Sequence, residues 1–202
     1  MVMTDVALAT EDELSETIGI RILSEIEYPM NASLLLRKGG YGYLRSKMDS
    51  WCQLSNHRPV VLLTDLDNME CPEMLIDDWF GQKHRPENLV LRVAVREVES
   101  WLLADHEAMR FLVGSKGKLP QNPDELENPK QSLLQLARSA KRDVRKDLVV
   151  ESGTVASQGI GYNSRLSALV QSKWSPKRAA QRSLSLKKAI TRIEELALRC
   201  KS

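Results

Sequence analysis

Cysteine and aromatic residues are scarce in this sequence, and long apolar runs are missing. Of 202 residues, three are cysteine, and none of the three belongs to a CxxC or CxxH pair. This spacing argues against a structural zinc site and a disulfide framework, so we expect reduced thiols in a cytoplasmic protein. No apolar stretch approaches the roughly 20 residues that span a membrane. The beginning of the sequence has no basic region followed by a long apolar stretch, so we expect no signal peptide.

Charge is distributed unevenly along the chain. Residues 1–115 contain 11 Lys and Arg against 19 Asp and Glu, whereas residues 116–202 contain 18 against 8. We predict an acidic α/β core over residues 1–115 and a helical, basic region over residues 116–202 that packs on it. An acidic half that binds metal and a basic half that binds phosphates would suit a polyanionic substrate. The alternative is that the helices of the second half only carry solvated basic faces, because no aromatic residues are interleaved with the basic cluster.

Hydrophobic periodicity predicts a mostly parallel sheet flanked by helices. The expected strands are residues 5–10, 60–63 and 88–95, with a short extended segment at 34–36. The expected helices are residues 14–26, 44–54, 72–80, 130–140, 164–171 and 183–200. Residues 28–33, 113–129 and 151–161 are expected to be loops, the last of them mobile. Ser175 is expected to cap a helix that begins at Pro176.

The sequence PVVLLTDLDN, residues 59–68, contains the strongest candidate site. Val60 to Leu63 form a continuous apolar run, which is typical of a strand buried on both faces. Asp65 and Asp67 follow at the carboxyl end of this strand, where open α/β sheets bind ligands. Two carboxylates so close together favour a divalent cation between them. The alternative is one aspartate that caps the next helix and another that is solvated.

Two other expected strands also end in acidic residues. Glu11 follows the first strand, and Glu97 or Glu99 follows the strand over residues 88–95. In the functional interpretation, Glu99 is part of the acidic site and is buried beside Trp101. Mg²⁺ or Mn²⁺ prefers such oxygen ligands, and the sequence therefore predicts a metal site formed by Asp65, Asp67 and Glu99. The competing interpretation is that each acid only favours the positive end of a helix dipole.

Two basic segments are candidates for contacts with phosphate. Arg37 and Lys38 precede a glycine-rich turn that contains Gly40 and Gly42 and leads into the next helix, and backbone amides in such turns can bind phosphate. A tight loop packed against the sheet is the alternative. Further along the chain, four cations form a concentrated basic face that predicts contact with nucleic acid, unless it is simply solvated. These residues are Lys141, Arg142, Arg145 and Lys146.

Four segments carry a resemblance to a known group of proteins: LATEDELSE, RKGGYGYLR, VVLLTDLDN and RVAVREVESWLLAD. They resemble an uncharacterised bacterial family, a domain of unknown function with a Toprim-like fold. That family is related to Toprim nucleases of the overcoming-lysogenisation-defect type. The resemblance implies that Glu11 is the acid/base or metal-side glutamate and that Asp65 and Asp67 are Mg²⁺ ligands. Asp12 stands where the Toprim glutamate is usually followed by glycine, so the choice among Glu11, Asp12 and Glu13 stays open.

The motifs and the resemblance together leave three alternative functions, the third of them suggested only by the buried strand that ends in D-x-D. Family members often occur beside ATPases in mobile-element or defence gene neighbourhoods. The first alternative is a Mg²⁺-dependent nuclease or phosphoryl-transfer protein that acts on nucleic acid, with Glu11 and Asp65 as catalytic residues. The second is a non-catalytic module that partners an ATPase. The third is a phosphatase of the haloacid-dehalogenase type, in which Asp65 would be the nucleophile.

Overall fold

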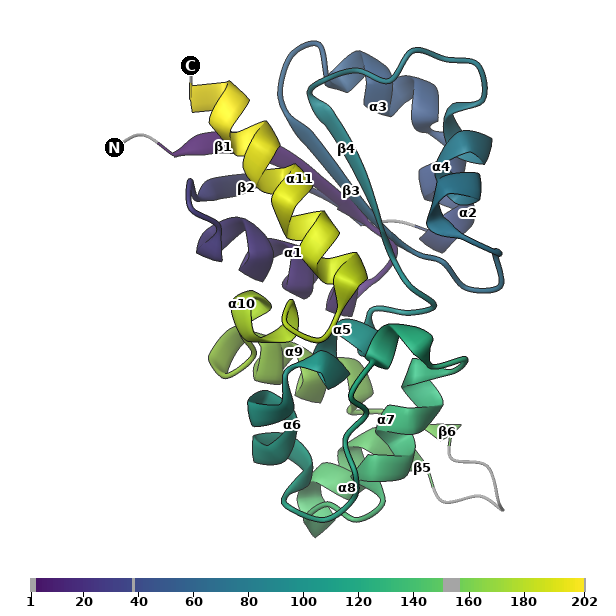
Figure 1. The fold of residues 1–202 in the computed structure, drawn as a ribbon, viewed down its shortest axis with the longest axis vertical. Coiled ribbons are helices and arrows are strands. Elements are labelled where there is room, and N and C mark those ends of the chain that lie inside the picture. Colours follow the sequence, from purple (N-terminus) through teal and green to yellow (C-terminus); the bar gives the residue numbers. More distant parts are fainter. Residues whose placement is uncertain (1–2, 38, 151–156, 202) are drawn as a thin grey trace.

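The computed structural model describes residues 3–37, 39–150 and 157–201. Within these residues, a central sheet of four parallel strands lies between two layers of helices (Figure 1). The predicted α/β class with a parallel sheet is thereby confirmed. The strands, in their order across the sheet, are β2 (Met30–Arg37), β1 (Thr4–Thr10), β3 (Val60–Asp65) and β4 (Leu89–Ala94).

Helices bury both faces of the sheet, which explains why β1 and β3 are continuously apolar rather than alternating. On one face, side chains such as Leu8 and Val61 pack in a large cluster. The helices of that face next to the sheet are α1 (Glu13–Glu25) and α11 (Leu184–Lys201). On the other face, side chains such as Ala9 and Leu62 form a second cluster. The helices there are α2 (Gly40–Ser46), α3 (Met48–Leu54) and α4 (Pro72–Phe80).

The strand register aligns the carboxyl ends of all four strands at one edge of the sheet. Thr10 of β1 lies beside Arg37 of β2 and beside Leu63 of β3. Asp65, the last residue of β3, lies beside Ala94, the last residue of β4. The segments that follow the strands therefore start close together at this edge, which we call the carboxyl edge of the sheet.

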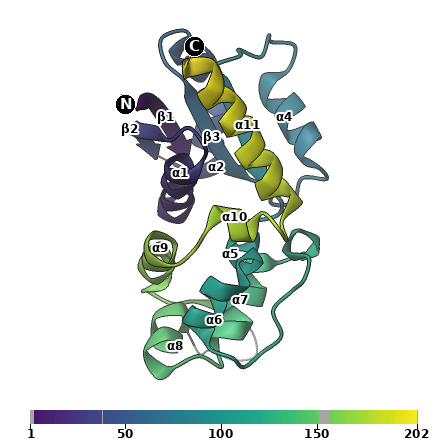
Figure 2. The same ribbon diagram turned by 60° about the vertical axis from the view of Figure 1, so that its left-hand side comes forward.

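A second group of helices lies below the carboxyl edge in the view of Figure 1, and Figure 2 shows the same division from another side. It comprises α5 (Glu99–Ala104), α6 (His106–Val113), α7 (Pro129–Ala137), α8 (Arg142–Leu148), α9 (Tyr162–Ser172) and α10 (Pro176–Ala179). A 3-10 turn and a short antiparallel pair also belong to this helical group: η1 (Pro123–Glu125), β5 (Val149–Val150) and β6 (Ser157–Gln158). None of the described helices is both long and apolar enough to cross a lipid bilayer.

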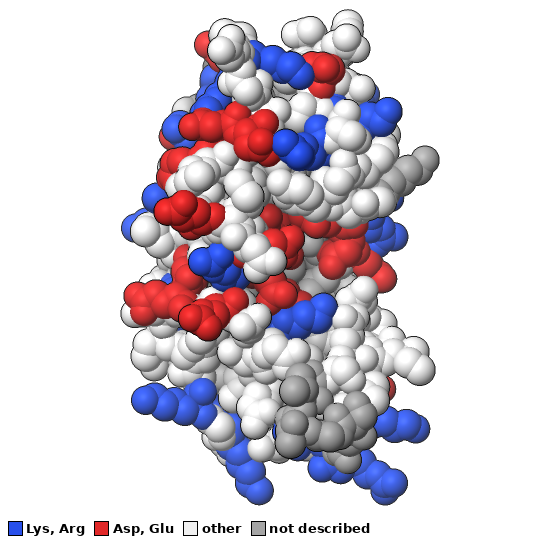
Figure 3. Space-filling model, turned by 90° about the vertical axis from the view of Figure 1, so that its right-hand side faces the viewer, with Lys and Arg blue, Asp and Glu red and all other residues white. Residues whose placement is uncertain are grey.

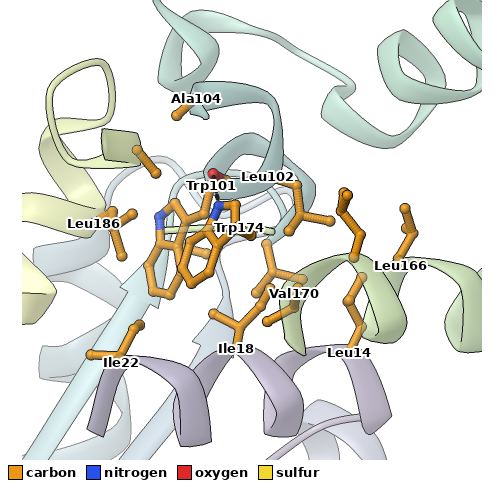
Figure 4. Close-up of a cluster of buried hydrophobic side chains, with 14 of the residues drawn as sticks. Leu14, Ile18, Ile22, Trp101, Leu102, Ala104, Leu166, Val170, Trp174 and Leu186 are labelled. Atoms are coloured by element: carbon orange, nitrogen blue, oxygen red, sulfur yellow. Dashed lines mark hydrogen bonds between the residues drawn. The ribbon is translucent and has the colours of Figure 1, made fainter. Parts of the chain in front are cut away.

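Two tryptophans join the helical group to the sheet layer. Trp101 and Trp174 are fully buried, and the Trp174 indole N–H donates to the Trp101 carbonyl at 3.0 Å (Figure 4). Ile18 of α1 and Val170 of α9 lie beside them in the same apolar cluster. Trp101 in turn donates its indole N–H to the Ser185 hydroxyl at 2.8 Å. The N–H groups of both buried indoles are thus satisfied, as burial of a tryptophan requires.

A buried ionic tie anchors the segment between α9 and α10. The Asp105 carboxylate is fully buried and accepts hydrogen bonds from Arg178 Nε at 2.9 Å and Nη2 at 2.8 Å. It also accepts the backbone N–H groups of Ser175 at 2.8 Å and Ala108 at 3.3 Å, the latter as the N-cap of α6. A buried carboxylate is stable only with such compensation. Asp105 is therefore a structural residue.

Most predicted elements are confirmed, and the differences have local causes. Met30 to Ser33, predicted as loop, belong to β2, in which alternate residues are exposed and include the polar Asn31 and Ser33. The helix predicted over residues 44–54 is interrupted at Lys47, which leaves helical geometry. Helix α10 begins at Pro176 as predicted, but the Ser175 side chain makes no capping bond. The three cysteines are free. Residues 151–156 of the expected mobile loop lie outside the described residues.

Candidate functional site

Glu11, directly after β1, reaches across to the neighbouring strand β3. Its Oε1 atom accepts the Thr64 hydroxyl and, at 3.0 Å, the backbone N–H of Asp65. Burial raises the pKa of Glu11, and the two hydrogen bonds partly offset this rise. The charges of Asp67 and Asp12 raise the pKa further. Asp12 caps α1 by accepting the Ser15 N–H, so Glu11 is the acid that turns toward the other strand ends.

Asp65 ends β3 and lies at the centre of the acidic group. Its Oδ1 atom accepts the backbone N–H of Val98 at 3.0 Å. The pKa of Asp65 is raised well above its usual value, first by burial and then by the negative charges of Glu99, Glu11 and Asp67. Crowding of like charges in a half-buried position disfavours the ionised form unless a cation compensates for it.

Asp67 and Arg96 form a strained link between the turns after β3 and β4. Both residues have left-handed backbone conformations, with φ of 48° and 62°. The Asp67 N–H donates to the Arg96 carbonyl at 2.9 Å, and the Arg96 guanidinium donates to the carbonyls of Asp67 and Met69. Left-handed residues other than glycine cost free energy and cluster at functional sites. Asp67 is exposed on the surface, but neighbouring groups keep part of the water away from its carboxyl group, and this desolvation raises its pKa.

Glu99 begins α5 and is nearly buried, with 5% of its surface exposed. Its Oε1 atom accepts the hydroxyl of Tyr162, the first residue of α9, at 2.7 Å. Burial raises the pKa of Glu99, the Tyr162 hydrogen bond lowers it, and the charge of Glu97 raises it again. Burial and the nearby Glu99 carboxylate raise the pKa of Tyr162, so its hydroxyl stays protonated and acts as the donor.

The helical group contributes a second contact to this edge. Glu97 accepts the backbone N–H of Lys130 at 2.9 Å, in the first turn of α7. The Lys130 ammonium lies over the Tyr162 ring, 5.1 Å from its centroid. Sequence reasoning missed both Lys130 and Tyr162, because neither belongs to a motif. Through these contacts of Glu97 and Glu99, helices α7 and α9 pack against one side of the carboxyl edge.

The glycine-rich turn lies at the same edge, beside the end of β1. Arg37 forms an ion pair with Glu16 of α1 at 3.5 Å. Gly40 begins α2 with φ of 65°, a conformation that favours glycine. A Cβ atom at Gly40 or at Gly42 would meet nothing within 4 Å, so neither glycine is there to make room for a neighbouring group. Lys38 lies outside the described residues.

The basic quartet lies far from the acids. Arg142, Arg145 and Lys146 belong to α8, which lies at the end of the helical group away from the sheet (Figure 1). Figure 3 shows a hollowed band of acidic side chains across the middle of one face and basic side chains at its lower end. Lys141, Arg142 and Lys146 are exposed, and Arg145 is partly buried. The structure therefore gathers the acids but does not place the quartet beside them.

The acidic group suits a hard divalent cation in its chemistry, although its side chains do not form a ready-made site. In the described part of the chain, no three His, Cys, Asp or Glu side chains are placed to hold a metal ion together. The donor set consists only of carboxylates, and Mg²⁺ commonly binds through one or two of them plus water and substrate phosphate. Hydrogen bonds between described residues engage one oxygen each of Glu11, Asp65 and Glu99. Such a donor set fits Mg²⁺ or Mn²⁺.

The chain belongs to the family described as Domain of unknown function (DUF4276), whose model matches residues 9–155. No curated protein and no solved structure matches the chain significantly. The matched range includes Glu11, Asp65, Asp67 and Glu99, whereas Tyr162 and α11 lie beyond it. The acids of the carboxyl edge therefore belong to the family region, and one of their hydrogen-bond donors comes from outside it.

Proposed function

We propose that this protein is a metal-dependent phosphoryl-transfer protein of the nuclease type that acts on nucleic acid. One observation carries the proposal: Asp65 ends a buried strand with its pKa raised well above the usual value, first by burial and then by four neighbouring carboxylates. A protein gains nothing in stability from acids crowded in this way, because each pays desolvation and repulsion. Binding a cation would relieve both costs, and perturbed carboxylates of this kind are typical of functional sites.

The residues of the carboxyl edge take separate roles in this proposal. Asp65, Asp67 and Glu99 would hold Mg²⁺ or Mn²⁺ after their side chains reorient, and the ion would polarise a phosphoryl oxygen and lower the pKa of water. Glu11, oriented by the Thr64 hydroxyl and the Asp65 N–H, would accept or return a proton at its carboxylate. Its raised pKa suits this role, because a general base works best when its pKa lies nearer the working pH. Tyr162 would keep Glu99 in place.

A Toprim-like relationship is part of the same proposal. A glutamate follows β1, a D-x-D pair follows β3, and these two strands are neighbours in the sheet. This is the arrangement that the sequence resemblance implies for a Toprim catalytic centre. Arg37 at the end of β2 would then face the same edge and is a candidate for contact with phosphate.

The test combines metal binding with nuclease assays on the purified protein. Mn²⁺ binding is measured by electron paramagnetic resonance for the wild type, Asp65→Asn and Asp67→Asn, with Asp49→Asn as the control. Asp49 is an exposed aspartate on α3, away from the carboxyl edge. We expect the first two substitutions to weaken Mn²⁺ binding at least tenfold and to abolish cleavage of DNA or RNA, and the control to do neither. Unchanged binding and cleavage in Asp65→Asn and Asp67→Asn would refute the proposal.

A second candidate function is a non-catalytic module that partners an ATPase. The observation that favours it is that Glu11, Asp65 and Glu99 each already accept a hydrogen bond from the protein itself. In this case the acids would order the turns after the strands rather than hold a metal. Metal-dependent cleavage by the purified protein alone, lost in Asp65→Asn, would exclude this candidate.

A further inference from the structure

Arg92 is an unusual residue for its position in the sheet. It is the one charged residue of β4, and the neighbouring inward residues on the same face, Val90 and Ala94, pack into the apolar cluster beneath α11. Its Nε atom is buried and has no hydrogen-bond partner among the described residues. A guanidinium cannot lose its proton in a protein, so an unpaired N–H in a buried position costs free energy. The arginine therefore lacks a partner that its position requires.

Hollows on the surface meet at this arginine. Arg92 lines a groove between α4 and α11, where two hollows of about 500 Å³ and 560 Å³ adjoin one another. A third hollow, of about 260 Å³, continues toward the start of β4. Figure 2 shows α11 and α4, the two helices that flank this groove. The space next to Arg92 is thus large enough for a small ligand or a segment of a larger one.

Positive charge predominates in the 560 Å³ hollow. Its lining contains four cations and two acids: Arg92, Lys187, Lys188, Arg192, Glu73 and Glu195. Glu195 is already paired with Arg192 at 2.7 Å. Burial and the positive charge of Arg192 both lower the pKa of Arg92, and Glu73 and Glu195 offset this only in part. The 560 Å³ hollow therefore contains more cations than anions.

We propose that this groove binds a phosphate group, with the Arg92 guanidinium donating hydrogen bonds and Lys188 and Arg192 adding positive charge. Phosphate fits because a tetrahedral oxyanion accepts several hydrogen bonds and a guanidinium can donate two of them in parallel. The phosphate has two chemical sources, free phosphate and the backbone of a nucleic-acid strand. The 500 Å³ hollow gives a longer ligand room toward Pro72 and Val95, next to the carboxyl edge. Its lining holds three cations and three acids, so the excess of positive charge that favours phosphate lies in the 560 Å³ hollow.

Inorganic phosphate is the probe for the first experiment. Its binding is measured by calorimetry at constant ionic strength and without divalent metal, for the wild type, Arg92→Met and Lys47→Met. Lys47 is an exposed cation between α2 and α3 that lines none of the hollows at Arg92, and it serves as the control. Loss of a charge-assisted hydrogen bond predicts binding at least about tenfold weaker in Arg92→Met and an unchanged dissociation constant in the control. Equal binding by Arg92→Met and wild type, or no binding by the wild type at about 10 mM phosphate, would overturn the proposal.

A second set of variants guards against misfolding and identifies the source of the phosphate. Lys188 and Arg192 are exposed on α11, so Lys188→Met and Arg192→Met leave the core intact and should each weaken phosphate binding several-fold. A single-stranded oligonucleotide is then titrated in the same way. Weaker oligonucleotide binding by Arg92→Met assigns the site to a nucleic-acid backbone, and unchanged oligonucleotide binding assigns it to free phosphate. Neither titration requires a metal or Asp65, so the outcome is independent of the proposed function.

Discussion

Glu99 and Asp105 are both buried carboxylates, and only the single helix α5 separates them, yet their surroundings differ. Asp105 accepts four hydrogen bonds, two of them from the Arg178 guanidinium. Glu99 accepts one from Tyr162, and its nearby charges are the negative Glu97 and Asp65 and the positive Lys130, with which it forms no ion pair comparable to that of Asp105 with Arg178. The first arrangement is complete in the folded protein. In the second arrangement, the crowded carboxylates lower the stability of the folded protein, and the rest of the fold compensates for this loss. Such a local loss of stability is typical of a binding site.

The largest expected effect on stability comes from removing the Asp105 carboxylate. Asp105→Ala leaves Arg178 without its partner and leaves the N–H groups of Ser175 and Ala108 unpaired. We expect a loss of about 2–4 kcal/mol in the free energy of unfolding, at the low end because Arg178 is partly exposed. Denaturant unfolding followed by circular dichroism measures this. A loss below about 1 kcal/mol would show that the hydrogen bonds of Asp105 do not stabilise the fold.

At the carboxyl edge, we expect the removal of a charge to raise the stability of the protein rather than lower it. Asp65→Asn keeps an acceptor for the Val98 N–H but removes one of the crowded charges. Without divalent metal at pH 8, we expect the variant to be more stable than the wild type by about 1 kcal/mol. Added Mn²⁺ should stabilise the wild type and not the variant. Thermal unfolding with and without Mn²⁺ is the measurement, with Asp49→Asn as control. A variant less stable than the wild type would mean that Asp65 resembles Asp105 instead.

The pH dependence of stability sharpens the same contrast. Asp65, Glu99 and Glu11 all have raised pKa values, so the folded state holds protons that the unfolded state has released. Stability should therefore fall as pH rises from about 4, the ordinary carboxyl value, through the raised values. Mg²⁺ should reduce this fall, because it binds the ionised forms. Thermal unfolding between pH 4 and 8 measures both effects, and a wild-type profile that matches Asp65→Asn would contradict the prediction.

The smallest expected effect concerns the hydrogen bond from the helical group. Tyr162→Phe removes the hydroxyl that donates to Glu99 while it keeps the buried ring. We expect a loss of about 1 kcal/mol or less in stability and a further rise in the pKa of Glu99, because the hydrogen bond lowers it. Carboxyl titration by nuclear magnetic resonance follows the pKa directly. A lowered pKa in the variant would show that Tyr162 does not stabilise the ionised glutamate.

The sequence allowed the local part of this description to be predicted, because strands and helices leave periodic patterns. The buried run before Asp65 and the acids after three strands indicated where the sheet ends and which carboxylates follow it. The partners of those carboxylates left no such pattern. Tyr162 is 63 residues from Glu99 in the chain, and Arg178 is 73 residues from Asp105. Contacts of this kind depend on how the elements pack, which local periodicity does not encode.

Helix α11 has a consequence for how the chain acquires its structure. It covers a sheet whose first strand ends at Thr10, although α11 itself begins only at Leu184. Contacts between segments so distant in sequence are slow to form, because a long loop must close before they add stability. On the ribosome, apolar residues such as Val90 and Ala94 would stay uncovered until α11 has been synthesised. Premature release of the chain would therefore expose an apolar face of the sheet, and we expect such fragments to aggregate.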